Sequence, residues 1–362
     1  MTSVVSNRTN LLALNEAEMA GFVSQLGWPK YRAHQILRWL YQSRVKSPAD
    51  MPNLSRADRE LLASSCAIER TARAHILSSE DGTRKFVLDL ADGLQIESVL
   101  IPDEDRLTLC LSSQAGCTLD CGFCLTGTMG LKRNLRAHEI VEQVLLAQDY
   151  LGENGRLTNL VFMGMGEPLA NLDAVADAVT RLTNKSWGLG FSSRRITIST
   201  AGLASRIKEI APLKINLAIS LNATTDELRR KLMPAANQLH SLRALLAACR
   251  TYPLAERERL TFEYVLLAGV NDRPEDATRL IRLLRGLRCK VNLIPFNPFP
   301  GSPYRRPSDE AIESFQNTLR LARVDAYLRK SRGRDVLGAC GQLGRTGKQQ
   351  GPVALTQIQP RC

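Results

Sequence analysis

The spacing of apolar residues divides the chain into stretches of different period. Over the first 75 residues, apolar side chains recur every three or four positions, a spacing that predicts amphipathic helices. Ser55 stands before the last of these runs as a suitable N-cap. We therefore predict a small helical domain over residues 1–75, without a catalytic set of residues, built from EAEMAGFVSQLG, YRAHQILRWLYQS and SRADRELLASSC.

A different period follows this helical stretch. The segment RKFVLDLADGLQIESVLIP contains two β-rich runs joined at Asp92-Gly93. This dipeptide suits a type I′ turn, which joins two antiparallel strands. We predict a β-hairpin linker over residues 76–103.

From about residue 107, strand-like and helical patterns alternate. Six strand–helix units in series predict an α/β fold whose parallel sheet has right-handed crossovers. The pattern alone leaves open a doubly wound sheet or a partial barrel; in both, functional loops lie at the carboxyl ends of the strands. We assign residues 104–340 to this core domain and 341–362, rich in Gly, Lys, Arg and Gln, to a flexible tail. The strand-like runs are LTLCLSS, TNLVFMGMG, RRITIST, KINLAISL, LTFEYVLLAG and KVNLIPFN.

Composition narrows the class of protein. Lys and Arg number 48 against 36 Asp and Glu, a net charge of +12, which favours a polyanionic partner; a basic protein without such a partner is the alternative. No apolar run is long enough to cross a membrane. The N-terminus lacks the order of a signal peptide, so we expect a cytoplasmic protein.

The nine cysteines indicate metal or redox chemistry rather than a disulfide framework. Cys117, Cys121 and Cys124 follow the first strand-like run of the core. Thiolates suit iron–sulfur clusters or zinc, and these spacings let one loop direct three sulfurs to one centre. Three ligands leave one iron of a four-iron cluster free, whereas structural zinc normally takes four. A zinc site completed by a distant cysteine stays the alternative.

The C-x₃-C-x₂-C motif, with Phe123 before its last cysteine, resembles the signature of radical S-adenosylmethionine (SAM) enzymes. This resemblance implies a partial (β/α)₆ barrel and a [4Fe–4S] cluster whose open iron binds SAM. Gly164-Met165-Gly166-Glu167-Pro168 resembles the motif that binds the methionine end of SAM. A carboxylate at Glu167 also pairs well with an ammonium group, although a carboxylate at a helix N-terminus is an equally good interpretation. The resemblance assigns SAM binding to Gly166, Glu167, Ser199, Ser220, Leu221, Asn222 and Asn297.

Further segments give a closer resemblance, to the RlmN/Cfr family of radical SAM RNA adenine methyltransferases. They are TLCLSSQAGC, ISTAG, ISLNA, PFNPFPG and RGRDVLGACGQL. The resemblance extends over most of the chain and is closest to the branch that methylates adenosine C2 in 23S rRNA and in tRNA beside the anticodon. The C8 branch shares the same cysteines, and no single residue separates the two. The family further implies an electron donor such as flavodoxin and a thiol reductant, and we expect a monomer.

In this family two more cysteines take part in the reaction, and they match Cys110 and Cys340. The resemblance implies that one SAM methylates Cys340 and that a second yields the radical that activates this methyl group. Cys110 then releases the methylated base and leaves a Cys110–Cys340 disulfide. Glu97 matches the proposed proton acceptor, and partial burial of its strand would raise its pKa. From residues alone, Cys110 also suits a small buried side chain, and Glu97 an exposed carboxylate.

Two other classes of protein fit part of the pattern. A zinc-stabilised RNA-binding protein suits the charge and the cysteines but gives no reason for GMGEP or GACGQL. A radical SAM activase or synthase shares the cysteine triad but has no role for Cys110 and Cys340. The remaining four cysteines match no family position. We interpret Cys66, Cys249 and Cys289 as packing residues and Cys362 as part of the tail.

Overall fold

The computed structural model describes residues 8–70, 73–153, 155–344 and 356–357. Its N-terminal part contains the three predicted helices, and Asn15 and Ser55 cap the first and third of them through hydrogen bonds to backbone N–H groups. Two short parallel strands bring the ends of this helical unit together. The elements are β1 (Thr9–Asn10), α1 (Glu16–Gln25), α2 (Tyr31–Tyr41), η1 (Pro48–Asp50), α3 (Arg56–Ser65) and β2 (Cys66–Ala67).

Seven parallel strands form the core, in the spatial order β6-β9-β10-β11-β12-β13-β14. Six strand–helix units succeed one another along the chain, which confirms the partial (β/α)₆ barrel. The strands are β6 (Arg106–Cys110), β9 (Asn159–Phe162), β10 (Ile196–Thr200), β11 (Asn216–Ser220), β12 (Leu260–Leu266), β13 (Cys289–Pro295) and β14 (Ala326–Leu328). Their connections contain α5 (Ala137–Leu151), η2 (Pro168–Asn171), α6 (Leu172–Thr183), η3 (Ser193–Arg195), η4 (Ala204–Leu213), α7 (Asp226–Leu232), α8 (Pro234–Leu239), α9 (Leu242–Arg250), α10 (Pro274–Leu284) and α11 (Asp309–Leu321).

An antiparallel extension continues the sheet from β6 through β5 (Gln95–Asp103), β4 (Arg84–Asp89) and β3 (Arg73–Ser78) to β15 (Thr356–Gln357). The predicted hairpin is β4–β5, but its turn is not type I′. Only Gly93 of the Asp92-Gly93 pair has a positive φ, of 81°, whereas a type I′ turn requires both. Asp92 instead accepts a hydrogen bond from the Leu94 N–H. The expected domain boundary at residue 75 falls inside β3.

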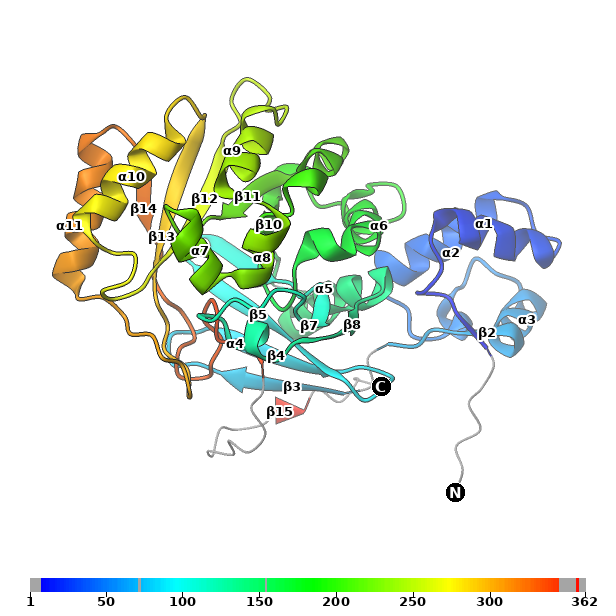
Figure 1. The fold of residues 1–362 in the computed structure, drawn as a ribbon. Coiled ribbons are helices and arrows are strands. Elements are labelled where there is room, and N and C mark those ends of the chain that lie inside the picture. Colours follow the sequence, from blue (N-terminus) through cyan, green and yellow to red (C-terminus); the bar gives the residue numbers. More distant parts are fainter. Residues whose placement is uncertain (1–7, 71–72, 154, 345–355, 358–362) are drawn as a thin grey trace.

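The helices cover the outer face of the curved sheet (Figure 1). On the outer side, α5 buries Ile140, Val141 and Val144 in the core. On the inner side, Ser220 pairs in register with Glu263 of β12, and Glu263 pairs with Asn292 of β13. Because registered residues project to the same face, the barrel interior is lined by polar side chains.

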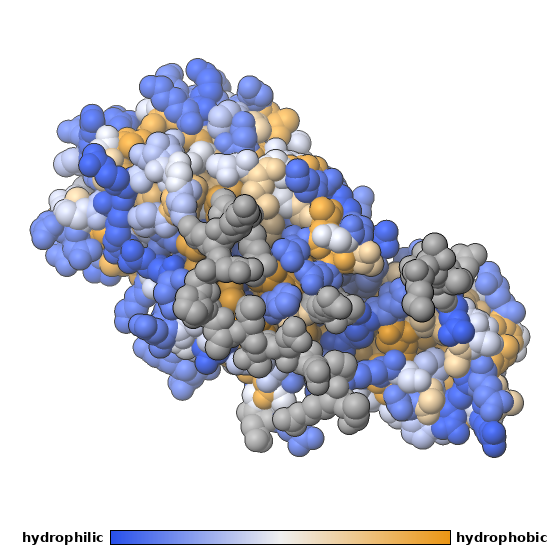
Figure 2. Space-filling view, turned by 90° about the horizontal axis from the view of Figure 1, so that it is seen from below, coloured by the Kyte–Doolittle hydropathy of each residue, from blue (hydrophilic) through white to orange (hydrophobic). Residues whose placement is uncertain are grey.

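The helical unit lies beside the N-terminal half of the barrel, at the right of Figure 1. Arg181 of α6 joins the two parts: its guanidinium donates to the Leu12 carbonyl (2.6 Å) and to the Tyr41 hydroxyl (2.9 Å). Arg44 of this unit also pairs with Asp149 at the end of α5. Seen from below, hydrophilic side chains dominate the outer edge of the barrel, whereas the helical unit shows hydrophilic and hydrophobic side chains together (Figure 2). Within the described residues, no helix combines the length and apolar character needed to cross a bilayer.

Candidate active site

The three clustered cysteines lie on one loop between β7 (Gln114–Gly116) and α4 (Leu125–Thr128). Strand β8 (Leu131–Asn134) follows α4 and pairs antiparallel with β7, so the two strands hold the ends of this segment together. The Cys117 N–H donates to Gly130 (3.2 Å), and the Gly122 N–H donates to Leu232 at the end of α7 (3.0 Å). Backbone hydrogen bonds to two separate parts of the chain therefore fix the loop.

The donor set fits an iron–sulfur cluster. Burial raises the pKa of the Cys121 thiol, and the charges of Cys124 and Cys117 raise it further, so the three sulfurs lie within electrostatic range of one another. No group of three or more His, Cys, Asp or Glu side chains in the described parts of the chain is placed to hold a single metal ion. A four-iron cluster is larger than one ion and takes three well-separated thiolates.

Glu167 lies at the carboxyl end of β9, as expected of a SAM-binding residue. It is 3% exposed, and burial raises its pKa against the hydrogen bonds that lower it. One carboxylate oxygen accepts from the Leu169 N–H (3.1 Å) and caps η2, and the other accepts from the Ala201 N–H (2.8 Å). The helix-cap interpretation is thus correct, and it leaves the second lone pairs of the carboxylate for a ligand.

Gly166 allows this motif to approach the cluster loop. Its φ is +99°, and a Cβ there would lie 2.5 Å from the Cβ of Gln114. The Gln114 side chain meanwhile accepts from the Glu167 N–H (2.9 Å) and from the Thr118 N–H (3.3 Å). One glutamine therefore ties the expected SAM motif to the loop of the three cysteines.

The other residues expected to bind SAM follow the strand ends, in two environments. The hydroxyls of Ser199 and Ser220 lie 3.1 Å apart across β10 and β11. Asn297 is 2% exposed, and its Oδ1 has no hydrogen-bond partner in the structure, as expected of an acceptor that faces a ligand. Asn222 is different, because its Oδ1 accepts from the Val265 N–H (2.9 Å). The Leu221 side chain is fully buried, so only its backbone is available to a ligand.

Cys340 lies on a loop fixed between the cluster loop and the end of β13. The Leu125 N–H donates to the Gly341 carbonyl (2.7 Å), and the Asn297 side-chain amide donates to the Cys340 carbonyl (3.1 Å). The structure therefore brings Cys340 together with the cysteine triad and with one expected SAM residue, although more than 200 residues separate Cys340 from the triad along the chain.

Gln342 and Leu343, the second and third residues of the expected tail, are packed into the fold. Gln342 and Leu343 are 2% and 5% exposed, and the Thr126 hydroxyl donates to the Leu343 carbonyl. The Gln342 amide donates to the Pro298 carbonyl (2.7 Å), and Leu343 belongs to the hydrophobic core, which composition alone did not indicate. Apart from 356–357, the rest of the expected tail lies outside the described residues.

Cys110 and Cys340 are both free thiols, and they lie within electrostatic range of each other. Cys110 is 7% exposed on β6, and burial is the main cause of its raised pKa, followed by the charge of Cys340. Cys340 is exposed to solvent but has protein on several sides, and desolvation raises its pKa as well. The charge of Arg329 lowers the pKa of both thiols, so a cation stands near the pair.

Glu97 is buried rather than partly exposed, and Lys85 pairs with it. Its carboxylate accepts from Lys85 Nζ (3.2 Å) and from the Gly344 N–H (2.9 Å). Lys85 also donates to the Leu337 carbonyl (3.3 Å). The ion pair thus holds the Cys340 loop on both sides of the cysteine. Glu97 also faces a cavity of about 260 Å³ that Gly116, Met165 and Gly344 line.

Three polar residues of the site were missed by sequence reasoning. Glu263 and Asn292 share a hydrogen bond of 2.8 Å inside the barrel, and Arg229 is buried beside the cluster loop. A carboxylate within the apolar run LTFEYVLL was a signal for Glu263. Arg229 gave none, because a basic residue on a short polar helix is usually a solvated one.

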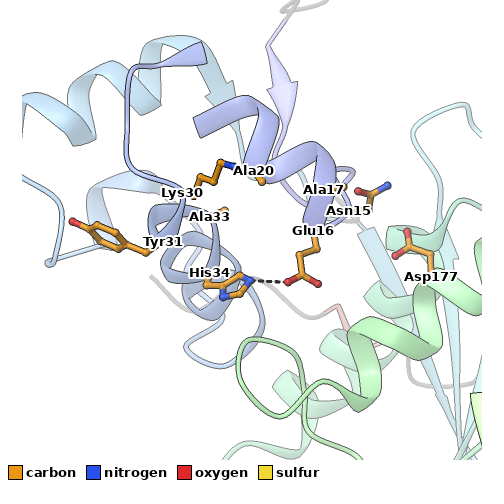
Figure 3. A pocket seen from close by; sticks show the side chains of 9 residues that line it. All are labelled: Asn15, Glu16, Ala17, Ala20, Lys30, Tyr31, Ala33, His34 and Asp177. Atoms are coloured by element: carbon orange, nitrogen blue, oxygen red, sulfur yellow. Dashed lines mark hydrogen bonds and ion pairs between the residues drawn. The ribbon is translucent and has the colours of Figure 1, made fainter. Parts of the chain in front are cut away.

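A second cavity, of about 620 Å³, lies between the helical unit and α6 (Figure 3). Lys30, Tyr31 and His34 of α2 and its N-cap line it opposite Glu16 and Asp177. The His34 ring and the Glu16 carboxylate approach to 2.6 Å across it. None of the cysteines lines this cavity, so it is separate from the site described above.

Comparison with known proteins agrees with this geometry. The family described as the Radical SAM superfamily matches residues 111–281, and the Ribosomal RNA large subunit methyltransferase N-terminal domain matches residues 9–68. A crystal structure of a radical SAM methyltransferase from Sphaerobacter thermophilus superposes with a TM-score of 0.87 at 44% identity. It covers 92% of this chain and 99% of that one. The fold and site are thus those of a radical SAM enzyme, which carries a [4Fe–4S] cluster and uses SAM.

Relatives over nearly the full length define the family within this class. The Dual-specificity RNA methyltransferase RlmN of Syntrophobacter fumaroxidans is 48% identical over 90% of this chain and 95% of its own. That of Syntrophus aciditrophicus is 48% identical over 93% and 97%. The chain belongs to the family of dual-specificity RNA methyltransferases RlmN.

Proposed function

We propose that this protein methylates C2 of an adenosine in 23S rRNA and of the adenosine beside the anticodon in tRNA. The observation that carries the proposal is the convergence of Cys110, Cys340 and the cysteine triad at the mouth of one barrel, in a chain of the RlmN family. C2 of adenine is electron-poor and does not attack a methyl sulfonium, whereas a carbon radical adds to it. The dual substrate and the C2 position follow the family, and C8 is the alternative position.

The proposed roles of the residues follow from their places in the site. When bound, the cluster and SAM supply a methyl group and, from a second SAM, a 5′-deoxyadenosyl radical. Cys117, Cys121 and Cys124 hold the cluster, and Gly166, Glu167, Ser199, Ser220, Leu221, Asn222 and Asn297 hold SAM. Cys340 carries the methyl group and, after losing one of its hydrogen atoms, presents the methylene carbon to C2.

Two residues complete the reaction. The adduct gives up its C2 proton to Glu97, once the RNA displaces the hydrogen bond between this carboxylate and the Gly344 N–H. It also gives up one electron, which the bound cluster would take back. The Cys110 thiolate then attacks the Cys340 sulfur, which breaks the bond from sulfur to the bridging carbon. The electron pair of that bond stays on the carbon, which takes up a proton from water and becomes the methyl group of the released base. The Cys110–Cys340 disulfide that remains takes two electrons from a thiol reductant. Arg329 favours the attack, because its charge stabilises the Cys110 thiolate.

The enzyme also needs a surface for RNA and a source of electrons. The helical unit binds RNA, with Arg32 and Lys46 as contacts. Arg32 lies over the ring of Tyr31 at 5.4 Å from its centre, and that ring is 57% exposed, an arrangement suited to a nucleic-acid surface. A low-potential protein such as flavodoxin supplies electrons. We propose a cytoplasmic monomer, because its RNA substrates are made and used there.

Nucleoside analysis tests the proposed function. We expect 2-methyladenosine in rRNA and tRNA from cells that contain this protein and its loss from cells that lack it. Restoring the wild-type gene restores the nucleoside, whereas the Cys340→Ala gene does not. The appearance of 8-methyladenosine instead would contradict the C2 assignment, and unchanged nucleosides in both RNAs would contradict the function.

A further inference from the structure

Arg229 is a buried cation held by carbonyl oxygens. Its side chain is fully enclosed on α7, and burial lowers its pKa. The guanidinium donates to the carbonyls of His240 (3.2 Å) and Ala201, and its Nε has no hydrogen-bond partner in the structure. Within the described residues no carboxylate lies within ion-pair distance of it, and Asp226 instead accepts from the Leu242 N–H. A buried, uncompensated charge of this kind is costly to a fold.

The cluster loop is the part of the site that could supply a negative charge to Arg229. Against the effect of burial, the charge of Cys121 raises the pKa of Arg229, and that of Asp226 does so to a smaller extent. The helix of Arg229 contacts the cluster loop directly through the Gly122 N–H and the Leu232 carbonyl. On its other side, Ala201 accepts from Arg229 and donates to Glu167. Arg229 therefore stands between the cysteine triad and the carboxylate proposed to bind SAM.

Gly202 makes room for the guanidinium. Its φ is +119°, and a Cβ at this position would lie 2.6 Å from Nη2 of Arg229. The backbone after β10 is therefore shaped around a buried cation that, in the described part of the chain, forms no ion pair.

We propose that Arg229 is the internal counter-charge of the cysteine-bound cluster and that it raises the reduction potential of this cluster. Three thiolates make the bound cluster an anion, and a one-electron reduction adds another negative charge. A guanidinium in a dry environment stabilises the reduced state more than the oxidised one, and salt screens it little. The electron itself comes from an external low-potential donor. The inference concerns the cofactor and holds whichever RNA is methylated.

The test compares neighbouring arginines on one helix. Arg229→Met removes the buried charge, Arg230→Met removes an exposed one, and Arg229→Lys keeps the charge but not the guanidinium. The cluster of each anaerobically reconstituted protein is titrated with dithionite and followed by electron paramagnetic resonance, at low and at high salt. We expect a more negative midpoint potential for Arg229→Met at both salt concentrations. Arg230→Met stays at the wild-type value and Arg229→Lys stays close to it.

A second measurement separates this role from a merely structural one. The gain in melting temperature on cluster binding is compared between wild type and Arg229→Met. We expect a smaller gain in Arg229→Met, because the cluster-free wild type alone contains the unpaired charge. An Arg229→Met protein with full iron content, an unshifted potential and the wild-type gain would overturn the proposal. If Arg229→Met retains no cluster, Arg229→Lys decides: a wild-type potential supports the proposal, and loss of its cluster too overturns it.

Discussion

At the scale of single residues, the buried ionisable groups around the site differ in how their charge is compensated. Glu167 receives hydrogen bonds from two backbone N–H groups, Glu97 has the ammonium of Lys85, and Arg229 has only carbonyl oxygens. The first arrangement fixes a carboxylate in place, and the second also fixes a loop. The third leaves a charge that a bound anion can use. These differences decide what each substitution should do.

The Lys85–Glu97 pair gives a prediction for stability. Lys85→Met leaves a buried carboxylate without its cation, so we expect a loss of about 3–5 kcal/mol in the free energy of unfolding of the cluster-free protein. In the double variant Lys85→Met/Glu97→Leu neither charge remains, and part of this loss should be recovered. Urea unfolding of wild type, Lys85→Met, Glu97→Leu and the double variant measures the coupling. Strictly additive losses would show that the pair does not act as a unit.

What the sequence could reveal at this scale depends on the distance between partners along the chain. The cysteine triad was predictable because its ligands lie within eight residues, and Cys110 and Cys340 were identified by their family motifs. The partner of Glu97 was not, because Lys85 meets it only through the register of β4 and β5. Arg229 was missed for a similar reason: α7 and the cluster loop are about 100 residues apart, and only the fold brings them together.

At the scale of elements, the first turn of α5 contains a histidine, His138, that the fold keeps neutral. Burial lowers the pKa of His138 to about 4, the nearby charges of Arg181, Arg136 and Arg133 lower it further, and Glu139 acts in the opposite direction. The ordinary pKa of histidine is 6.5. Between this pH and about pH 4, the unfolded chain therefore binds a proton at His138 that the folded chain does not bind. Stability from this residue is present above pH 6.5 and is lost as the pH falls toward 4.

This effect can be isolated by substitution. His138→Gln cannot bind the proton in either state, so we expect its free energy of unfolding to fall less than that of wild type between pH 6.5 and 4. The difference should reach at most about 3 kcal/mol at the acid end. Denaturant unfolding at a series of pH values measures it, and at pH 8 the two proteins should show no pH-dependent difference. Parallel curves throughout would contradict a lowered pKa.

Elements were predicted correctly where the stretch of regularly spaced apolar residues was long, and they were missed where this stretch was short. The three N-terminal helices and the six units of the barrel were predicted, but β3 was not, because RAHILS is brief and follows a helix. The connection after β10 is η4, a 3₁₀ run with Pro212 inside it, for which an α-helical period gives no guide. The turn type at Asp92-Gly93 was wrong because the Leu90 N–H donates to the Leu94 carbonyl, so that three residues rather than two connect the strands.

At the scale of the whole molecule, the helical unit and the barrel are joined by buried polar contacts rather than by a linker. Arg181 and Trp187 of the barrel are each 1% exposed, and Tyr41 of the helical unit packs on Trp187 with ring centres 5.9 Å apart. Removal of residues 1–75 would expose both and would cut β3. The contribution of this unit to RNA binding is therefore better examined with surface substitutions such as Arg32→Ala.

The central claim is that Cys340 carries the transferred carbon and Cys110 releases it. Cys110→Ala keeps every group needed to methylate Cys340 and to join it to the base, but it has no thiolate to break the final bond. We predict that Cys110→Ala protein, purified from cells, migrates on denaturing gels with RNA attached. After nuclease digestion, mass spectrometry should find one carbon between the Cys340 sulfur and adenine. Normal turnover by Cys110→Ala without an adduct would contradict the protein-bound methylene route.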